Sequence, residues 1–285
     1  MNSALKLIEC PRDAMQGWKN FIPTEKKIRY INSLLKVGFD TVDFGSFVSA
    51  KAIPQMADTK EVSSKIEMPN PNAKLLAIIA NLRGAEQASA FDHITCLGFP
   101  FSVSETFQER NTNSSIHESL KRVEEIQNLC VNKNKKLVIY ISMAFGNPYG
   151  DPYDEDIVFN WVEKLVELDI EIISLADTVG IASPGQVYDM TSYLIESLPS
   201  TEIGVHLHST FENWQEKLDA ATKAGCKRFD GALKGIGGCP MANDDLVGNM
   251  NTEWMINYFE TRGMNPGIDK NALLDSLAIA EETFV

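Results

Sequence analysis

The sequence predicts a closed (β/α)8 barrel with a short C-terminal helical extension, and three observations support this fold class. Eight short aliphatic or β-branched segments alternate with amphipathic segments of helical periodicity along the 285 residues. No Pro/Gly/Ser-rich linker interrupts the chain, so we expect a single catalytic domain over residues 1–285. An open doubly wound sheet is the alternative, but no nucleotide-binding glycine fingerprint supports it.

The expected strands share runs of aliphatic and β-branched residues between polar or glycine-containing segments. In chain order they are Leu5 to Glu9, Thr41 to Phe44, Leu75 to Ala80, His93 to Leu97, Lys136 to Ser142, Ile170 to Ser174, Glu202 to His206 and Arg228 to Ala232. The expected helices share apolar residues at spacings of three and four. They include Thr24 to Val37, Ile116 to Val131, Asp154 to Leu168, Pro184 to Ser197, Asn213 to Ala224 and Thr252 to Thr261. We expect Thr24, Ser115 and Ser183 to cap three of these helices, because their hydroxyl oxygens can accept hydrogen bonds from first-turn N–H groups.

The composition is typical of an ordinary globular protein, with 44% hydrophobic residues. The net charge of -13 and the lack of a Lys/Arg-rich run argue against a nucleic-acid partner. No apolar run is long enough to span a bilayer, and the first residues lack the apolar core of a signal peptide. We therefore expect a cytoplasmic protein with no nucleic-acid or membrane partner.

The five cysteines show neither the density nor the C-x-x-C spacing of a disulfide or zinc framework, which fits a reducing compartment. Cys10, Cys96, Cys130 and Cys226 lie in or beside apolar segments, where a buried thiol is the common outcome. Cys239 differs because it follows the loop sequence Gly-Ile-Gly-Gly.

Two short motifs predict a divalent-metal site and therefore an enzyme. Arg12 and Asp13 follow the first expected strand, and His206 and His208 lie at the end of the seventh. Residues two apart in a strand face the same side, so both imidazoles can reach one ion together with Asp13. An isolated Arg-Asp pair is explained equally well as a structural ion pair, but two of the chain's four histidines in this register favour a metal site.

The predicted fold places further polar residues beside this motif, because barrel enzymes carry their catalytic groups at the C-terminal ends of the strands. Asp43 ends the second expected strand, Asp177 and Thr178 follow the sixth, and the glycine loop to Cys239 follows the eighth. We therefore expect all of them on one rim of the barrel.

Seven segments carry a family resemblance. They are Pro-Arg-Asp-Ala-Met-Gln (11–16), Ser-Phe-Val-Ser-Ala-Lys-Ala-Ile-Pro-Gln-Met (46–56), Asn-Thr-Asn-Ser-Ser-Ile-His-Glu-Ser (111–119), Ser-Leu-Ala-Asp-Thr-Val-Gly (174–180), His-Leu-His (206–208), Gly-Ile-Gly-Gly-Cys-Pro (235–240) and Gly-Asn-Met-Asn-Thr-Glu (248–253). With them, the chain resembles the 3-hydroxy-3-methylglutaryl-CoA (HMG-CoA) lyases of the DRE-TIM metallolyase family, nearly from end to end. Arg-Asp and His-Leu-His mark the superfamily, whereas Ser-Phe-Val-Ser and Gly-Gly-Cys-Pro mark the lyases.

The resemblance implies a Mg²⁺ or Mn²⁺ site made by Asp13, His206 and His208, with Asn249 as a further oxygen ligand. It implies an acyl-CoA thioester substrate and a retro-Claisen cleavage of HMG-CoA to acetoacetate and acetyl-CoA. Family members are commonly homodimers, so a homodimer is expected. The pathway, leucine breakdown or another, is left open.

The resemblance also implies roles for individual residues. Arg12 would stabilise the thioester oxygen of the acetyl-CoA enolate, and Cys239, on a lid loop of about residues 233–250, would protonate the enolate carbon. His206 would take part in catalysis as well as in metal binding, and Asp43 and Asp177 would orient their neighbours. For Cys239, a plain loop with a free thiol remains the alternative.

Further residues are expected to contact the substrate. Gln16, Ser46 and Thr178 are predicted to line its pocket. Asn111 and Ser115, at a helix start that can accept an anion, are predicted to contact the CoA portion.

The chain departs from the family pattern at several positions of the predicted site. The family usually has glycine in place of Cys10 and Ala14, an acidic residue in place of Ile8, glutamate in place of Asp43 and cysteine in place of Asn147. The fifth strand also lacks an arginine that is common near its start. Because Asp13 and both histidines are present, these changes affect the choice of 3-hydroxyacyl thioester more than metal binding.

Two other functions remain open. One is the chemistry of a superfamily relative such as isopropylmalate synthase or 4-hydroxy-2-oxovalerate aldolase, although these lack a Gly-Gly-Cys-Pro lid. The other is a catalytically inactive barrel used for binding, against which the intact Arg12, Asp13, His206 and His208 argue.

Overall fold

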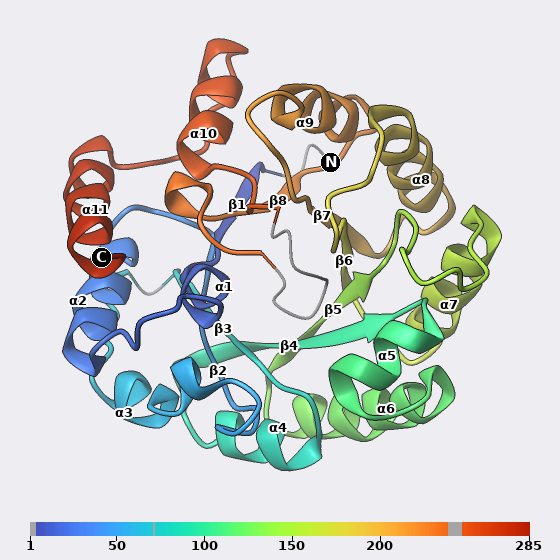
Figure 1. Cartoon of the computed structure of the whole chain (residues 1–285), viewed down its shortest axis with the longest axis horizontal. Coiled ribbons are helices and arrows are strands. Elements are labelled where there is room, and N and C mark those ends of the chain that lie inside the picture. Colours follow the sequence, from blue (N-terminus) through green and yellow to red (C-terminus); the bar gives the residue numbers. More distant parts are fainter. Residues whose placement is uncertain (1–3, 71, 239–246) are drawn as a thin grey trace.

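The computed structural model describes residues 4–70, 72–238 and 247–285. Within them, each strand pairs in parallel with the next, and the eighth pairs with the first to close the barrel (Figure 1). The predicted (β/α)8 fold is therefore confirmed. The strands are β1 (Lys6–Glu9), β2 (Thr41–Ser46), β3 (Lys74–Ile78), β4 (Ile94–Ser102), β5 (Lys136–Ser142), β6 (Ile172–Ala176), β7 (Glu202–His206) and β8 (Arg228–Gly231).

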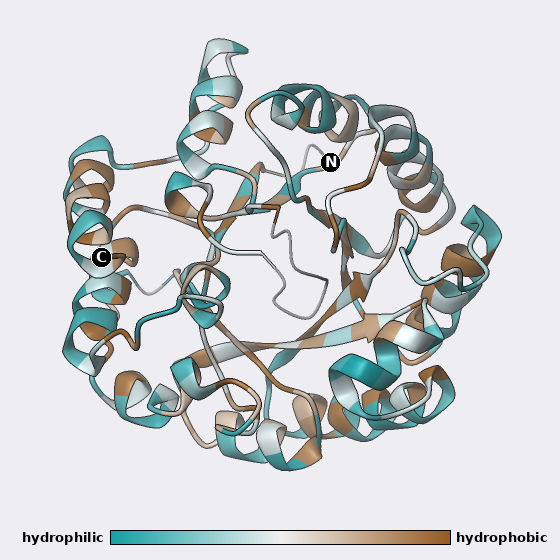
Figure 2. Ribbon diagram, viewed as in Figure 1, coloured by the Kyte–Doolittle hydropathy of each residue, from teal (hydrophilic) through white to brown (hydrophobic). Residues whose placement is uncertain are grey.

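Helices surround the barrel, and their outward faces are largely polar (Figure 2). They are α1 (Pro11–Gln16), α2 (Thr24–Leu34), α3 (Thr59–Ser64), α4 (Leu82–Ser89), α5 (Glu105–Thr112), α6 (Ile116–Asn132), α7 (Glu155–Val166), α8 (Pro184–Ser197), α9 (Trp214–Lys223), α10 (Thr252–Thr261) and α11 (Lys270–Thr283), with the short 3-10 helices η1 (Pro54–Met56) and η2 (Leu233–Gly235). In the described ranges, no helix is both long enough and apolar enough to cross a membrane.

Most strand boundaries follow the periodicity of the sequence, and β5 and β7 have the predicted bounds. The predicted end of the fourth strand at Leu97 was wrong, because β4 continues through Gly98 and Pro100 to Ser102. Glycine usually weakens a strand. Here a Cβ on Gly98 would lie 2.5 Å from the Ile78 side chain, so glycine lets the barrel interior close.

The sixth strand lies two residues later than predicted. Asp169 has a positive φ of 59°, and the Ile170 N–H donates to the carbonyl oxygen of Leu165 at 3.3 Å. This turn, which ends α7, therefore includes Ile170, and the strand starts only at Ile172.

The predicted helix caps were right in two cases of three. Ser115 and Ser183 each accept a hydrogen bond from the N–H three residues later and form capping boxes. Thr24 is instead the first residue of α2, and its hydroxyl donates to Asp58 at 2.8 Å. Helix α2 also ends at Leu34, before the predicted Val37.

Several short helices were not predicted, among them α1, α3, α4 and α5. The expected C-terminal extension is the 14-residue helix α11, which contacts α2. Phe284, just after it, packs edge-on against Tyr30, with the ring centroids 5.7 Å apart.

The apolar core has two parts. The larger part fills the space between strands and helices, and a small cluster of Leu76, Cys96, Val138 and Tyr140 packs separately from it. The four cysteines predicted to be buried thiols are buried and free, as expected.

Candidate metal centre and pocket

Helix α1 begins directly after β1 and brings Arg12 and Asp13 into its first turn. Pro11 suits the first helical position because its missing N–H would have no partner there. Both charged side chains are more than nine-tenths buried, so each needs a partner inside the protein.

Arg12 lies between two carboxylates. Its Nη1 donates to Asp13 Oδ1 at 2.6 Å, while Nη2 and Nε donate to Asp43 Oδ2 at 2.6 and 3.0 Å. Gln16 Nε2 donates to the same Asp13 oxygen at 2.8 Å. The predicted position of Asp43 at the end of its strand was wrong, because β2 continues to Ser46 and Asp43 lies within it.

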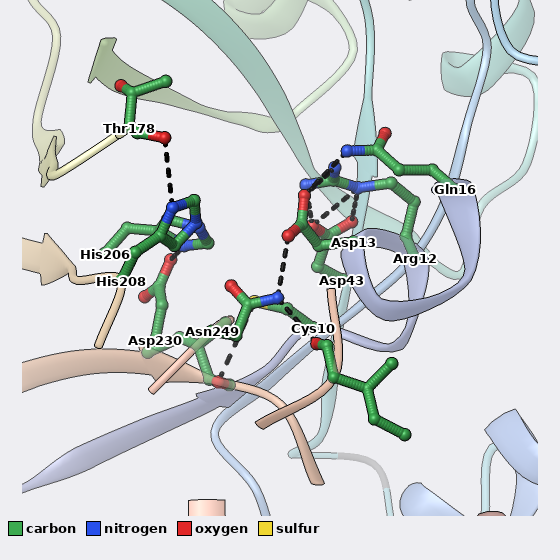
Figure 3. Close-up of polar contacts among 12 residues, drawn as sticks. Cys10, Arg12, Asp13, Gln16, Asp43, Thr178, His206, His208, Asp230 and Asn249 are labelled. Atoms are coloured by element: carbon green, nitrogen blue, oxygen red, sulfur yellow. Dashed lines mark hydrogen bonds and ion pairs between the residues drawn. The ribbon is translucent and has the colours of Figure 1, made fainter. Parts of the chain in front are cut away.

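Asp13, His206 and His208 come together, with their ligand atoms all within 4.8 Å of one another (Figure 3). His208 Nδ1 lies 3.1 Å from the carbonyl oxygen of Thr178, which can only accept a hydrogen bond. Nδ1 therefore carries the proton, and Nε2 keeps a lone pair. His206 Nδ1 lies 3.2 Å from Asp230 Oδ2, which leaves Nε2 of that ring for an ion.

Asn249 completes this group of side chains. Its Nδ2 donates to Asp13 Oδ2 at 2.8 Å and to the carbonyl oxygen of Ile236 at 2.9 Å, which fixes the orientation of the amide. Asn249 Oδ1 and His208 Nε2 are buried and have no hydrogen-bond partner among the residues that the structure describes. Because buried polar atoms are rarely unpaired, these two atoms are well suited to ligate a cation.

The pKa shifts of Asp13 and His208 favour ligation of a cation, whereas, against the effect of burial, the hydrogen bond and charge of Asp230 raise the pKa of His206, so an ion must displace a proton there. Burial opposes ionisation of Asp13, but the charge of Arg12 and the hydrogen bond from Asn249 help to outweigh it and hold the pKa of Asp13 well below its usual range. Burial, together with the charge of His206, lowers the pKa of His208 to about 4, so His208 is neutral and able to ligate. Burial raises the pKa of Asp43 to about 6 despite the opposing charge of Arg12.

The donor set of a carboxylate, two imidazoles and an amide oxygen, without thiolate, suits Mg²⁺, Mn²⁺ and similar divalent ions. A second grouping, Cys10, His206 and Asp230, shares His206 with the first. Burial raises the pKa of the Cys10 thiol well above its usual value, so this thiol is protonated and a poor ligand.

A pocket of about 170 Å³ opens beside the cluster. Arg12, Asp13, His206 and His208 line it together with the predicted Gln16, Thr178 and Asn111. The remaining lining is mostly apolar and includes Val48, Ile53, Ile78, Pro100, Phe107 and Tyr140. A small polar group of ligands therefore faces an apolar chamber, as is usual for small-molecule sites.

Two of the residues predicted to contact the substrate are not in this pocket. Ser46 is buried, and its hydroxyl accepts the N–H of Val48 at 3.3 Å. At the start of α6, the Glu118 carboxylate accepts from the N–H of Ser115 at 2.8 Å, and Glu105 accepts from the N–H of Ile116 at 3.2 Å. The protein's own carboxylates thus accept from these two N–H groups, and the contact of Ser115 with CoA stays a prediction.

Asp177 and Cys239 were also predicted to belong to the site. Asp177 lies outside the pocket, where it accepts hydrogen bonds from Lys217 at 2.6 Å and from the N–H of Ala182 at 3.1 Å. Cys239 lies outside the described residues. His93, outside the pocket, bonds to Ser63 at 3.0 Å.

Asp230 and Tyr140 lie beside the metal cluster and were not predicted. Asp230 faces His206 because the two residues are paired in the register of β7 and β8. The alternation in β8 was the available signal, since Asp230 lies two residues after Arg228 and is an acidic residue in an apolar run. Tyr140 lines the pocket and packs edge-on against His206, with the ring centroids 5.8 Å apart.

The sequence was also compared with known protein families, and the HMGL-like family model matches residues 5–279. The chain belongs to the HMGL-like family. Among its relatives is the cytoplasmic 3-hydroxy-3-methylglutaryl-CoA lyase of Rattus norvegicus, 32% identical over 95% of this chain and 79% of that protein. The mitochondrial hydroxymethylglutaryl-CoA lyase of Bos taurus is 33% identical over 95% of this chain and 83% of its own length.

Solved structures of this family share the fold. An HMG-CoA lyase from Acinetobacter baumannii, in complex with coenzyme A and 3-methylmalate, superposes with a TM-score of 0.91 at 33% identity. The match covers 99% of this chain and 91% of that one. The resemblance predicted from the sequence motifs is confirmed.

Proposed function

We propose that this chain is a divalent-metal-dependent carbon–carbon lyase that cleaves HMG-CoA to acetyl-CoA and acetoacetate. The observation that carries the proposal is the cluster of Asp13, His206 and His208, which lies beside Arg12 at the wall of an apolar pocket. Membership of the HMGL-like family, whose relatives named above are HMG-CoA lyases, supports the same reaction.

Asp13, His206, His208 and Asn249 are the residues proposed to hold the cation, Mg²⁺ or Mn²⁺. When bound, such an ion supplies Lewis-acid polarisation of the substrate oxygens. The free Nε2 of His206 cannot ligate an ion and accept a proton at the same moment. We therefore assign this nitrogen to metal binding, with Asp230 fixing the ring.

Arg12 is proposed to bind the thioester oxygen on which negative charge develops as the carbon–carbon bond breaks. Each of its terminal nitrogens donates to one carboxylate and retains a second N–H. Asp43 holds the guanidinium through Nε and Nη2, so the remaining donors have a fixed direction before the substrate binds. Asp43 therefore acts as a positioning residue.

The pocket is proposed to bind the acyl chain and the adjoining part of CoA. Gln16 and Thr178 provide polar groups near the ligand cluster, and Asn111 lies on α5 at the pocket wall. Apolar residues such as Val48 and Phe107 exclude water from the reacting atoms. Cys239 stays the proposed proton donor to the enolate carbon.

The test is turnover of HMG-CoA by the purified protein with Mg²⁺ or Mn²⁺. We expect acetyl-CoA and acetoacetate in equal amounts, loss of turnover with excess EDTA and its return when the metal is restored. A panel of 3-hydroxy-3-alkylglutaryl thioesters, run in parallel, tests the acyl specificity. If the metal-loaded protein cleaves another thioester and not HMG-CoA, the substrate assignment is wrong and the lyase class stands; no cleavage of any member refutes the proposal.

A cytoplasmic location and a homodimer also belong to this proposal. The named relatives include both a cytoplasmic and a mitochondrial protein. Light scattering of the purified protein measures the oligomeric state, and cell fractionation measures the location.

A further inference from the structure

Helix α9 carries a lysine that points inward, toward the loops of the candidate metal centre. Lys217 lies in the first turn of α9 and is 1% exposed. An ammonium group removed from water requires a carboxylate or several carbonyl oxygens around it. The hydrogen-bond partners of Lys217 therefore show which segments of the chain it holds in place.

Among the described residues, the Lys217 ammonium has three partners, which come from two different loops. Nζ donates to Asp177 Oδ2 at 2.6 Å, to the carbonyl oxygen of His208 at 2.9 Å and to that of Gly180 at 3.0 Å. An ammonium group has three N–H donors, so all of them are used. One of these acceptors belongs to a predicted metal ligand.

The same contacts also fix the ring of that ligand. The loop after β6 carries Asp177, Thr178 and Gly180, and the Thr178 carbonyl oxygen orients the His208 imidazole through Nδ1 (Figure 3). The N–H of Asp177 donates to the carbonyl oxygen of His206 at 3.0 Å. Lys217 thus holds the main chain of His208 and the loop that orients its side chain.

The segment that carries Asn249 packs against His208 and the residue after it. Asn249 forms an isolated antiparallel bridge with His208, and the Ser209 N–H donates to the carbonyl oxygen of Gly248 at 3.0 Å. A Cβ added to Gly180 would lie 2.8 Å from the Val247 side chain, which shows how closely the two segments approach.

We propose that Lys217 is a positioning residue for the metal centre, which acts by holding the His208 and Gly180 carbonyl oxygens in place. It touches neither the substrate nor the ion. This inference rests on the proposed function, because it assumes that His208 binds a divalent cation.

The test measures Mn²⁺ binding by electron paramagnetic resonance, together with the free energy of unfolding in urea. Lys217→Met keeps the length of the side chain but removes the charge and all three donors. We expect Mn²⁺ affinity to fall by roughly 10- to 100-fold, the usual cost of losing a group that orients a metal ligand. Unchanged affinity would overturn the inference.

A second variant separates positioning from charge compensation. Lys217→Met leaves the Asp177 carboxylate buried without a cation, which itself destabilises the fold. Combining it with Asp177→Asn removes that stranded charge and keeps an oxygen for the Ala182 N–H. We expect the double variant to regain stability but to bind Mn²⁺ as weakly as the single variant. Recovery of affinity together with stability would show that Lys217 is only a counter-charge.

Lys27→Met is the matched control. Lys27 is also 1% exposed, and it pairs with Asp58 at 2.8 Å and with the Gln55 carbonyl oxygen, outside the pocket. We expect lower stability and unchanged Mn²⁺ affinity, and an equal loss of affinity in this control would overturn the inference.

Turnover of HMG-CoA separates this inference from the proposed function. Weaker Mn²⁺ binding in the Lys217 variants of a protein that does not cleave HMG-CoA would support the positioning role and refute the substrate. A wild-type protein that binds no Mn²⁺ would overturn the inference.

Discussion

Replacing Glu9 by glutamine should make the protein more stable at alkaline pH. Glu9 is fully buried on β1, where its carboxylate accepts hydrogen bonds from the Leu233 N–H at 2.8 Å and from the Thr252 hydroxyl at 2.6 Å. Burial nevertheless outweighs these bonds and raises the pKa of Glu9 from 4.5 to about 8. The folded protein therefore keeps a proton that the unfolded chain loses.

The direction of the pH effect follows from this difference in bound protons. Below pH 4.5, Glu9 is protonated in both states and contributes no pH dependence. Between pH 4.5 and about 8 the folded state binds more protons than the unfolded state, so the free energy of unfolding falls as the pH rises. The interval from 4.5 to about 8 corresponds to an upper limit of about 5 kcal/mol, at about 1.4 kcal/mol per pH unit.

The assay is urea unfolding of the wild type and Glu9→Gln at intervals from pH 5 to 9, followed by tryptophan fluorescence. Glutamine keeps an oxygen for the Leu233 N–H and an amide that can pair with Thr252. Any change in these bonds adds a constant to the difference in unfolding free energy, whereas loss of the ionisable group adds a pH-dependent part. We expect the free energy of unfolding of the variant, relative to that of the wild type, to increase steadily as the pH rises. This difference should become constant above about pH 8.

Parallel stability curves for the two proteins would refute this account of Glu9. Glu118→Gln is the control, because Glu118 is exposed and glutamine also serves at the third position of a capping box. The free energy of unfolding of Glu118→Gln, relative to that of the wild type, should not increase as the pH rises above neutrality.

Three further predictions concern the site. Asp230→Asn should weaken Mn²⁺ binding, measured by electron paramagnetic resonance, by roughly 10- to 100-fold, because the ring of His206 loses its charged partner; wild-type affinity would remove Asp230 from the metal centre. Arg12→Lys should lower kcat for HMG-CoA by about two to three decades, since a lysine cannot replace the fixed fork of donors, and a change in KM alone would contradict this. Cys239→Ser should lower turnover and leave Mn²⁺ affinity unchanged, and full activity would exclude Cys239 as the proton donor.

The fold was largely predictable because its signals are local. The alternation of a strand and the periodicity of a helix can each be recognised from a few neighbouring residues. In the same way, Ser115 and Ser183 cap the helices that directly follow them. The local signal failed where the environment of the residue decided the outcome. Gly98, for example, lies inside β4 because the Ile78 side chain of the neighbouring strand needs the space that a Cβ would fill.

Within the site, the motifs alone were enough to predict which residue types suit a divalent ion and which strand ends carry them. The metal cluster joins Asp13 to a histidine pair almost two hundred positions later in the chain, and the motifs alone placed them together. The hydrogen-bond partners of the two histidines came only from the folded chain: Asp230 for His206, and Thr178 and Lys217 for His208. The partner of a side chain depends on the register of neighbouring strands and on which loops meet when the barrel closes. Periodicity within one segment contains neither kind of information.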